Sequence, residues 1–290
     1  MVNGWRRRRL HAALLLLAAM IALAVLAPWL ATHDPRRAVP EEQLVPPSTG
    51  HYFGTDLLGR DVFSRTLYGG RRTLGVAVLT ALIALGPGLA IGVTAGYGGR
   101  WLDASLMMLM DALLAFPSLI LALALIALLG SGTVQVALAV GIAGIPSYAR
   151  VTRAAVIQAR SLPFVEAARA LGAGPRAILW RHVIPTAAPP LLAFAGVTLS
   201  WALLNGAALM FLGYGGDIAA PEWGVMLADG RAAFRNAPWV ALAPGVALSV
   251  TVLAINLLAA IGVSEGEYRI RAHYRNTSPG DPRPIQPIDA

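Results

Sequence analysis

The sequence predicts an all-α membrane protein with six transmembrane helices, and two observations support this prediction. Hydrophobic residues make up 57% of the 290 positions and charged residues only 13%, with a mean hydropathy of +0.63. Such a composition offers too little polar surface to coat a soluble globule of this length. The apolar residues also form long uninterrupted runs, whereas the strands of a membrane barrel would alternate polar and apolar residues.

Six segments are long or apolar enough to cross a hydrocarbon core of about 30 Å, which takes roughly 20 helical residues. The fourth segment is short and contains Gly141, Gly144 and Pro146, and its small residues suit close helix packing in lipid. The six predicted spans are residues 10–30, 74–97, 106–129, 132–148, 187–212 and 240–263.

The basic run Arg6 to Arg9 precedes the first span, which exceeds the apolar length of a cleaved signal peptide. We therefore expect a retained signal anchor whose Arg residues stay in the cytosol. Six spans then place both termini in the cytosol, in a multi-pass protein of the bacterial plasma (inner) membrane. Arg residues are more numerous in the segments that this topology assigns to the cytosolic side, as expected for this orientation.

These spans divide the chain into four parts. Residues 1–31 hold the Arg cluster and the first span, 32–73 an extracytoplasmic connection, 74–263 a five-helix core, and 264–290 a Pro-rich cytoplasmic tail that we expect to be partly disordered.

Asp61, near the end of the connection, is expected to open an amphipathic helix whose apolar residues Val62, Phe63 and Leu67 lie on the bilayer surface. That helix either closes the outer end of the bundle, the interpretation we favour, or contacts a protein partner.

A polar island between the fourth and fifth spans, residues 161–185, is the most informative part of the chain. Pro163 suits the first turn of a helix, and Glu166 lies where the helix dipole favours an anion. The apolar residues of this helix fall near one face and are Phe164, Ala167, Ala168 and Leu171.

Gly172 and Gly174 permit a sharp change of direction after this helix. A second short helix then starts at Pro175, and Pro185 is expected to break it from the fifth span. The result is a two-helix elbow that can push on the spans at both of its ends.

The elbow resembles the coupling loop of the membrane subunits of ATP-binding-cassette (ABC) importers. The resemblance rests on Glu166-Ala167-Ala168, Gly172 and the pair Ile184-Pro185. The run 181–185, Arg-His-Val-Ile-Pro, also follows the form seen in the dipeptide, oligopeptide and nickel branch of binding-protein-dependent importer permeases. Further segments similar to this branch span roughly residues 50–257 and are 53–65, 96–97 with Asp103, 111–117, 223–227 and 238–239.

The resemblance implies the six-helix bundle of a type I ABC importer permease, which forms the translocation pathway for peptides or similar small solutes. It implies three kinds of partner besides the lipid bilayer: a second permease subunit, two ATP-binding-cassette ATPase subunits and an extracytoplasmic solute-binding protein. It also implies ATPase-coupling roles for Phe164, Glu166, Ala167, Ala168, Leu171, Gly172, Ile184 and Pro185.

The sequence departs from the family pattern at three places. Thr186 stands where the family usually has Asn, and Met108 stands where it often has a basic residue. After residues 256–258, the apolar run 259–263 replaces a Gly-Asp pair and a basic stretch. This last change puts in doubt how the sixth span ends.

No catalytic role, cofactor or metal is expected for this chain. It contains no Lys, which excludes a phosphate-binding loop of the Gly-Lys-Ser/Thr type, and no Cys. Its five His residues lack the spacing of a metal site. Most Arg residues flank apolar runs, where they would meet lipid headgroups, so nucleic acid is not an expected partner.

Polar residues inside spans are costly and are therefore candidates for the translocation pathway. Asp111 either lines this pathway or lies near the cytosolic end of its helix with access to water. Asn205 and Asn256 are further candidates, although hydrogen bonds between helices are the favoured role for both.

Two other function classes require features of a different kind. A secondary (ion-coupled) transporter would use ionisable groups near the membrane midplane and often an inverted repeat. A membrane enzyme would need clustered acid–base or metal groups. Neither pattern is evident in the sequence.

Overall fold

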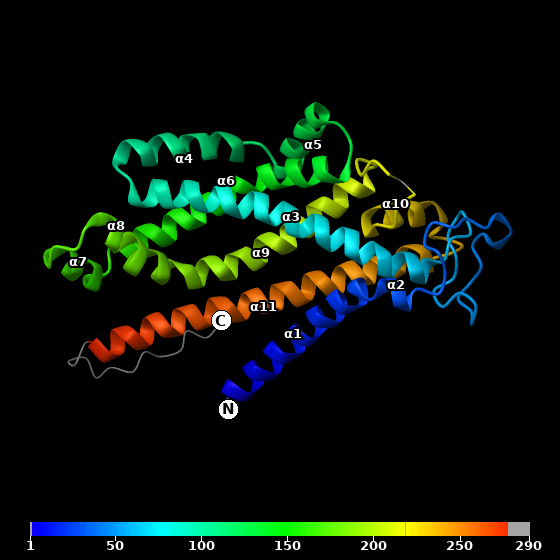
Figure 1. Cartoon of the computed structure of the whole chain (residues 1–290), viewed down its shortest axis with the longest axis horizontal. Coiled ribbons are helices and arrows are strands. Elements are labelled where there is room, and N and C mark those ends of the chain that lie inside the picture. Colours follow the sequence, from blue (N-terminus) through cyan, green and yellow to red (C-terminus); the bar gives the residue numbers. More distant parts are fainter. Residues whose placement is uncertain (1, 218, 278–290) are drawn as a thin grey trace.

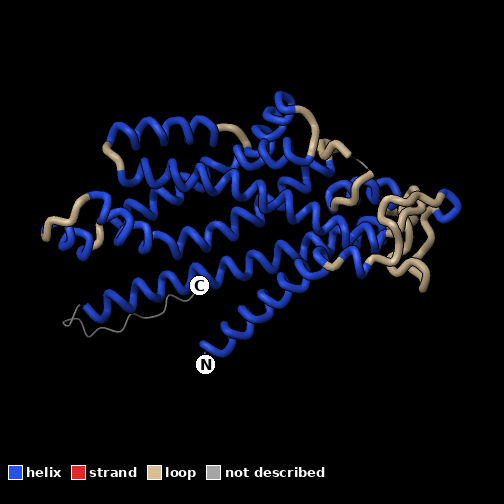
Figure 2. Tube along the Cα trace, in the orientation of Figure 1, coloured by secondary structure: helices blue, strands red, loops and turns tan. Residues whose placement is uncertain are grey.

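The computed structural model of the chain describes residues 2–217 and 219–277. Helices dominate these residues and run along the long axis of an elongated bundle (Figures 1 and 2). The long helices are α1 (Val2–Val25), α3 (Val62–Tyr97), α6 (Thr133–Arg160), α9 (Ile184–Phe211) and α11 (Trp239–Thr277). The shorter ones are α2 (Ala27–Leu30), η1 (Pro40–Glu42), α4 (Arg100–Leu114), α5 (Ser118–Leu129), α7 (Pro163–Ala170), α8 (Pro175–Ile178), η2 (Leu179–Val183) and α10 (Trp223–Ala233).

Four helical segments of the described chain are each long and apolar enough to cross a membrane: Val62–Tyr97, Thr133–Arg160, Pro175–Phe211 and Trp239–Ala260. They overlap the predicted second, fourth, fifth and sixth spans. The first predicted span is a shorter apolar helix, Leu10–Val25, followed by the separate turn of α2 with Pro28 in its first turn.

The predicted third span, residues 106–129, is interrupted by a sharp bend. This segment belongs to two helices, α4 and α5, which are bent by 89° relative to each other. Pro117 lies at the break and precedes the first residue of α5. Proline has no backbone N–H and disfavours the helical conformation for the residue before it, and both effects favour a break at this position.

Three helices extend beyond their predicted bounds. Asp61 opens α3 as expected, because its side chain accepts a hydrogen bond from the backbone N–H of Ser64. That helix continues without a break into the second span, so Val62 and Leu67 are buried in the protein instead of lying on the bilayer surface. Likewise, α6 runs on to Arg160, and α11 continues through the changed segment 259–263 to Thr277. Residues 278–290 of the predicted tail lie outside the described residues.

Small residues let α3 and α6 approach closely. A Cβ atom on Gly92 would lie 2.4 Å from Cβ of Thr152, and one on Gly96 would lie 2.9 Å from Cβ of Val156. On α6, Gly144 faces Ala84 and the ring of Trp201 from α9. The predicted role of small residues in close packing is therefore confirmed.

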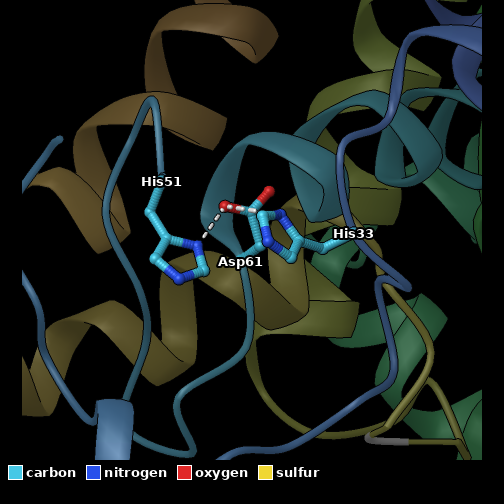
Figure 3. Close-up of side chains that lie close together, drawn as sticks. All are labelled: His33, His51 and Asp61. Atoms are coloured by element: carbon cyan, nitrogen blue, oxygen red, sulfur yellow. Dashed lines mark hydrogen bonds and ion pairs between the residues drawn. The ribbon is translucent and has the colours of Figure 1, made fainter. Parts of the chain in front are cut away.

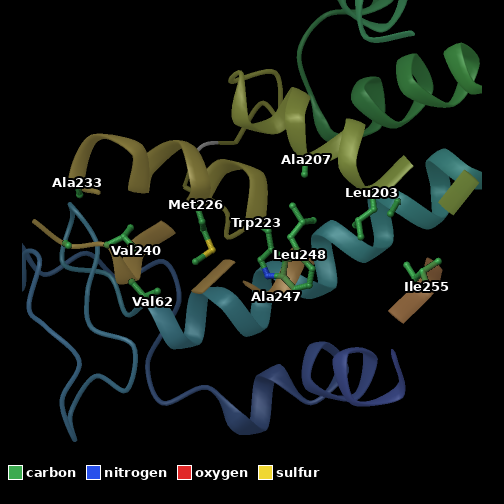
Figure 4. Packing of buried hydrophobic residues seen from close by; sticks show 12 residues of the cluster. Val62, Leu203, Ala207, Trp223, Met226, Ala233, Val240, Ala247, Leu248 and Ile255 are labelled. Carbon is green, nitrogen blue, oxygen red and sulfur yellow. The ribbon is translucent and has the colours of Figure 1, made fainter. Parts of the chain in front are cut away.

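A cluster of buried residues around Trp223 joins α3, α9, α10 and α11 (Figure 4). Trp223 is only 2% exposed, and its indole N–H donates to the backbone oxygen of Thr66 at 2.9 Å. Beside it, the buried carboxylate of Glu222 accepts from Thr73 and from the backbone N–H of Val225. The indole thus has its polar atom satisfied while its apolar surface fills the core.

The two ends of the bundle differ in character. The end that we call the loop end consists of residues 31–61 and α10, and Figure 1 places it opposite α7 and α8. Buried charges connect its parts: Arg60 contacts Asp56 at 2.6 Å and Asp229 of α10 at 2.9 Å. Arg65 of α3 lies 3.4 Å from the same Asp56. The loop is therefore fixed to α3 and α10.

Candidate functional site

Residues 161–185 form the predicted elbow at the end of the bundle opposite the loop end (Figure 1). Its first helix, α7, starts at Pro163, as expected for a residue that needs no hydrogen-bonding partner there. The chain then turns at Gly172, whose φ of +88° is unfavourable for residues with a side chain. Gly174, by contrast, has a φ of −69°, which other residues adopt, so only the first of the two glycines is needed for the bend.

The second helix of the elbow does not end at Pro185, and that part of the prediction is wrong. The chain from Pro175 to Phe211 is one helical path through α8, η2 and α9. η2 is a π turn, with the N–H of Ile184 bonded to the oxygen of Leu179. This wider turn accommodates the ring of Pro185 at the start of α9 without breaking the helix.

An apolar base fixes the elbow to the bundle. Val165 of α7, Ile178 of α8 and Val183 of η2 are each at most 2% exposed. They share a buried cluster with Val156 of α6 and Ala187 of α9. A displacement of α7 must therefore displace the ends of α6 and α9, since close-packed side chains transmit strain.

Two hydrogen bonds add α3 to this assembly. The hydroxyl of Tyr97 donates to the backbone oxygen of Pro175 at 2.7 Å, and Arg160 donates to the backbone oxygen of Gly96 at 2.7 Å. Sequence reasoning predicted contact with the two flanking spans only and missed both side chains. The sequence gives no sign of these two contacts, because a hydrogen bond to a backbone oxygen far away in the chain requires no particular spacing of residues.

The expected apolar face of α7 is turned largely outward. Leu171 is 88% exposed and Phe164 is 39% exposed, with the ring of Phe164 against that of His182. Ala167 is exposed and Ala168 is half-buried. The remaining predicted coupling residues are either exposed, as are Glu166, Gly172 and Pro185, or half-buried, as is Ile184.

A hollow of about 600 Å³ lies beside the elbow. Its lining includes Tyr97, Arg160 and Arg169, so it is cationic. The elbow thus presents an exposed apolar ridge next to a positively charged recess, on a base that contacts three spans.

The three pathway candidates have different surroundings. Asp111 of α4 is half-exposed and pairs with Arg150 of α6, and a second pair, Asp103 with Arg153, connects the same two helices. Asn205 donates to the backbone oxygen of Trp201 in its own helix, so its observed hydrogen bond is not the expected one between helices. Asn256 is exposed on α11.

Comparison with known proteins agrees with this architecture. The family model described as the binding-protein-dependent transport system inner membrane component matches residues 88–263. The dipeptide transport system permease protein DppC of Alkalihalophilus pseudofirmus is 38% identical over 245 residues, which cover 84% of this chain and 81% of that protein. The glutathione transport system permease protein GsiD of Pectobacterium atrosepticum is 38% identical over 259 residues, which cover 88% and 86%.

The fold is shared with a solved importer. A structure of the MetNI methionine ABC transporter in inward-facing conformations aligns with a TM-score of 0.58 and 20% identity, covering 72% of this chain and 95% of that one. The fold is that of a type I ABC importer permease and not that of an ion-coupled transporter. Because the family model matches more than half of the chain and the relatives are similar over most of their length, the chain belongs to the inner-membrane components of binding-protein-dependent transport systems, as the permease subunit of an ABC importer.

Proposed function

We propose that residues 161–185 are the coupling site at which an ATP-hydrolysing subunit moves this permease. The observation that carries the proposal is the exposed ridge of Phe164 and Leu171 on a base that contacts α3, α6 and α9. An exposed apolar ridge beside a cationic recess suits a protein partner whose surface offers an apolar groove and acidic groups.

In the complete importer, this chain pairs with a second permease subunit and is served by two ATPase subunits and an extracytoplasmic solute-binding protein. Closure of the ATPase pair on ATP draws the two elbows together and opens the spans outward, and hydrolysis resets them. The permease itself carries no catalysis in this scheme. Its elbow lies in the cytoplasm with both termini, and the loop end faces the binding protein.

Peptides or peptide-like molecules are the proposed solutes. Support comes from the relatives, whose names specify dipeptide and glutathione transport. In this scheme the binding protein selects the solute, and the permease pathway admits whatever is delivered. Asp111, Asn205 and Asn256 are therefore proposed to affect the rate of passage without setting specificity.

A charge reversal in the elbow tests the coupling role. Glu166→Lys places a cation at the amino-terminal end of α7, where the helix dipole disfavours it by roughly 0.3–1 kcal/mol, and reverses the charge that the partner meets. In the reconstituted complex we expect solute uptake per ATP hydrolysed to fall at least about tenfold, which corresponds to about 1.4 kcal/mol of lost coupling.

Glu41→Lys is the matched control, since it makes the same change at an exposed position of the loop end. It should leave co-purification with the ATPase unchanged. Normal uptake per ATP in Glu166→Lys, together with uptake that survives deletion of 166–171, would show that the elbow is not the coupling site.

A further inference from the structure

Three potential metal ligands meet where the loop end joins α3 (Figure 3). His33 follows α2, His51 lies in the loop before α3, and Asp61 is the N-cap residue of α3. One ligand atom from each side chain lies within 4.8 Å of the other two. The spacing of the His residues along the chain gives no sign of this cluster, because loop segments bring them together.

The distances are close to those of a coordinated cation. Nδ1 of His51 lies 2.9 Å and Nδ1 of His33 lies 3.8 Å from the same atom, Oδ1 of Asp61. Ligand bonds of about 2.0–2.2 Å in a tetrahedron place neighbouring ligand atoms about 3.3–3.5 Å apart. For a cation to fit, one of these contacts must open and the other close, each by about half an ångström, and the ligand nitrogens of the two rings, which lie within 4.8 Å of each other, must reach the same spacing.

The carboxylate is held in place by groups other than the two rings. Oδ2 of Asp61 accepts from the backbone N–H of Ser64 at 2.8 Å, while Oδ1 faces both rings. Its side chain is 1% exposed, so the protein and not solvent fixes its orientation. Ligands held in this way lose little freedom when a cation binds.

His51 also has the outer partner that metal-binding imidazoles usually have. Its Nε2 faces Oε2 of Glu42 at 3.4 Å. A proton on Nε2 satisfies that carboxylate and leaves the lone pair of Nδ1 directed at the cluster. Nδ1 of His33 lies 2.9 Å from the hydroxyl of Thr32, which keeps that ring oriented and would be displaced by a bound cation.

We propose that His33, His51 and Asp61 bind one divalent transition-metal cation of the zinc class. Two imidazole nitrogens and one carboxylate oxygen suit Zn²⁺, Ni²⁺ or Co²⁺, whereas Mg²⁺ and Ca²⁺ require mainly oxygen ligands. A solvent molecule completes the tetrahedron and reaches it past His33, whose side chain is 44% exposed.

A purely hydrogen-bonded cluster is the alternative, and the arrangement of the rings argues against it. Asp61 and His51 already form a complete hydrogen-bonded pair at 2.9 Å. The second imidazole nevertheless stacks on the first with a centroid distance of 4.6 Å and directs a nitrogen at the same oxygen. A hydrogen bond between Asp61 and His51 does not require this second ring, whereas one cation would use both ring nitrogens and the shared oxygen.

Binding of the cation would cross-link the segments of the loop end. The three ligands belong to segments before, within and after the loop, so coordination joins the exit of the first helix to the start of α3. The proposal concerns this chain's own fold and does not depend on the coupling role of the elbow.

The test uses the purified full-length chain, without a histidine tag, as the wild type and as His33→Ala, His51→Ala and Glu42→Gln. Equilibrium dialysis with Zn²⁺ at about neutral pH, where imidazole is mostly unprotonated, should give one tight equivalent for the wild type. We expect the affinity to fall at least about tenfold in each variant, including the outer-shell change in Glu42→Gln. Co²⁺ in place of Zn²⁺ should give the intense visible absorption of a tetrahedral site in the wild type alone.

His182→Ala, in the elbow, is the matched control and should bind Zn²⁺ as the wild type does. Zn²⁺ should also raise the unfolding temperature of the wild type and of the control but not of His33→Ala, and Mg²⁺ should raise neither. The proposal is overturned if wild type takes up no zinc at tens of micromolar, or if the double variant His33→Ala, His51→Ala binds it equally well. Either outcome leaves a hydrogen-bonded cluster only.

Discussion

Single glycines set how closely α3 and α6 approach each other. Gly92 meets Thr152 and the backbone oxygen of Ala149 on α6, with no room for a Cβ atom. Gly75 on the same helix has nothing within 4 Å of a Cβ position. Both glycines lie inside α3, and only their surroundings decide whether a side chain can be added.

Gly92→Ala should destabilise the chain by about 1–3 kcal/mol, because the added methyl lies 2.4 Å from Thr152 Cβ and 2.5 Å from Ala149 O. Gly75→Ala is the control and should stabilise by about 0.5–1 kcal/mol, since alanine favours a helix interior. Thermal unfolding of both variants in detergent measures the difference. Equal unfolding temperatures would show that the two helices do not pack as described.

Glu222 is a second residue whose surroundings matter, in this case for the pKa of its carboxyl. Burial raises the pKa of its carboxyl above the ordinary 4.5, while hydrogen bonds from Thr73 and from the backbone of Val225 and Gly224 act in the opposite direction. The folded state therefore holds this proton more tightly than the unfolded chain does. The contribution of the carboxyl to stability is complete below pH 4.5 and decreases as the pH rises through the folded pKa.

Glu222→Gln removes this titration and keeps a neutral side chain of the same shape. The stability of the wild type relative to the variant should decrease with rising pH above 4.5. The slope should approach about 1.4 kcal/mol per pH unit until the folded pKa is passed. Unfolding midpoints of both proteins across pH 4 to about 8 measure it. A difference that is constant with pH would mean that the carboxyl is ionised in the folded protein.

At the scale of elements, the bend of the elbow depends on one backbone conformation. Gly172 has a φ of +88°, and the oxygen of Arg169 accepts its N–H at 3.0 Å. Proline needs a φ near −65° and has no N–H to donate. Gly174 can carry a side chain, because its φ is −69° and a Cβ there would meet nothing within 4 Å.

Gly172→Pro should therefore unfold the turn between α7 and α8 and lower uptake per ATP at least about tenfold in the reconstituted importer, as about 1.4 kcal/mol of coupling is lost. Gly174→Ala should retain full coupling. Uptake and ATP hydrolysis should be measured in the same vesicles, because their ratio distinguishes a loss of coupling from a smaller amount of complex. Full coupling in the proline variant would contradict the described bend.

The sequence predicted the long helices from composition and from runs of apolar residues. It predicted the elbow from the positions of Pro and Gly residues. The sequence did not predict features that depend on contacts between residues far apart in the chain. α3 continues through the predicted boundary at residue 73, and Trp223 packs against Gly69 and Gly70 just before it. Pro185 does not separate α8 from α9, because the π turn η2 accommodates its ring. The hydrogen bonds of Tyr97 and Arg160 depend on tertiary proximity alone.

At the scale of the whole molecule, the elbow and the loop end lie at opposite ends of the bundle (Figure 1). We expect opposite sides of the membrane for them. The absence of Cys makes the chain suitable for a direct test with single cysteines. Leu171→Cys and Glu41→Cys change exposed positions at the two ends.

In intact cells, a membrane-impermeant maleimide should label Glu41→Cys at least about tenfold faster than Leu171→Cys, because thiolate access controls the reaction. Inverted vesicles should reverse the order. Equal labelling of both variants, or the opposite order in cells, would contradict the proposed orientation.

Helix α3 reaches from the loop end to the elbow within a single element and takes part in both assemblies. Its 36 residues correspond to about 54 Å of helix, from the buried charges around Arg65 to the hydroxyl of Tyr97. Pro87 is the only proline within it. A displacement at one end of α3 is therefore expected to reach the other end, and Pro87, which removes one helix hydrogen bond, is the position at which we expect this helix to bend most easily.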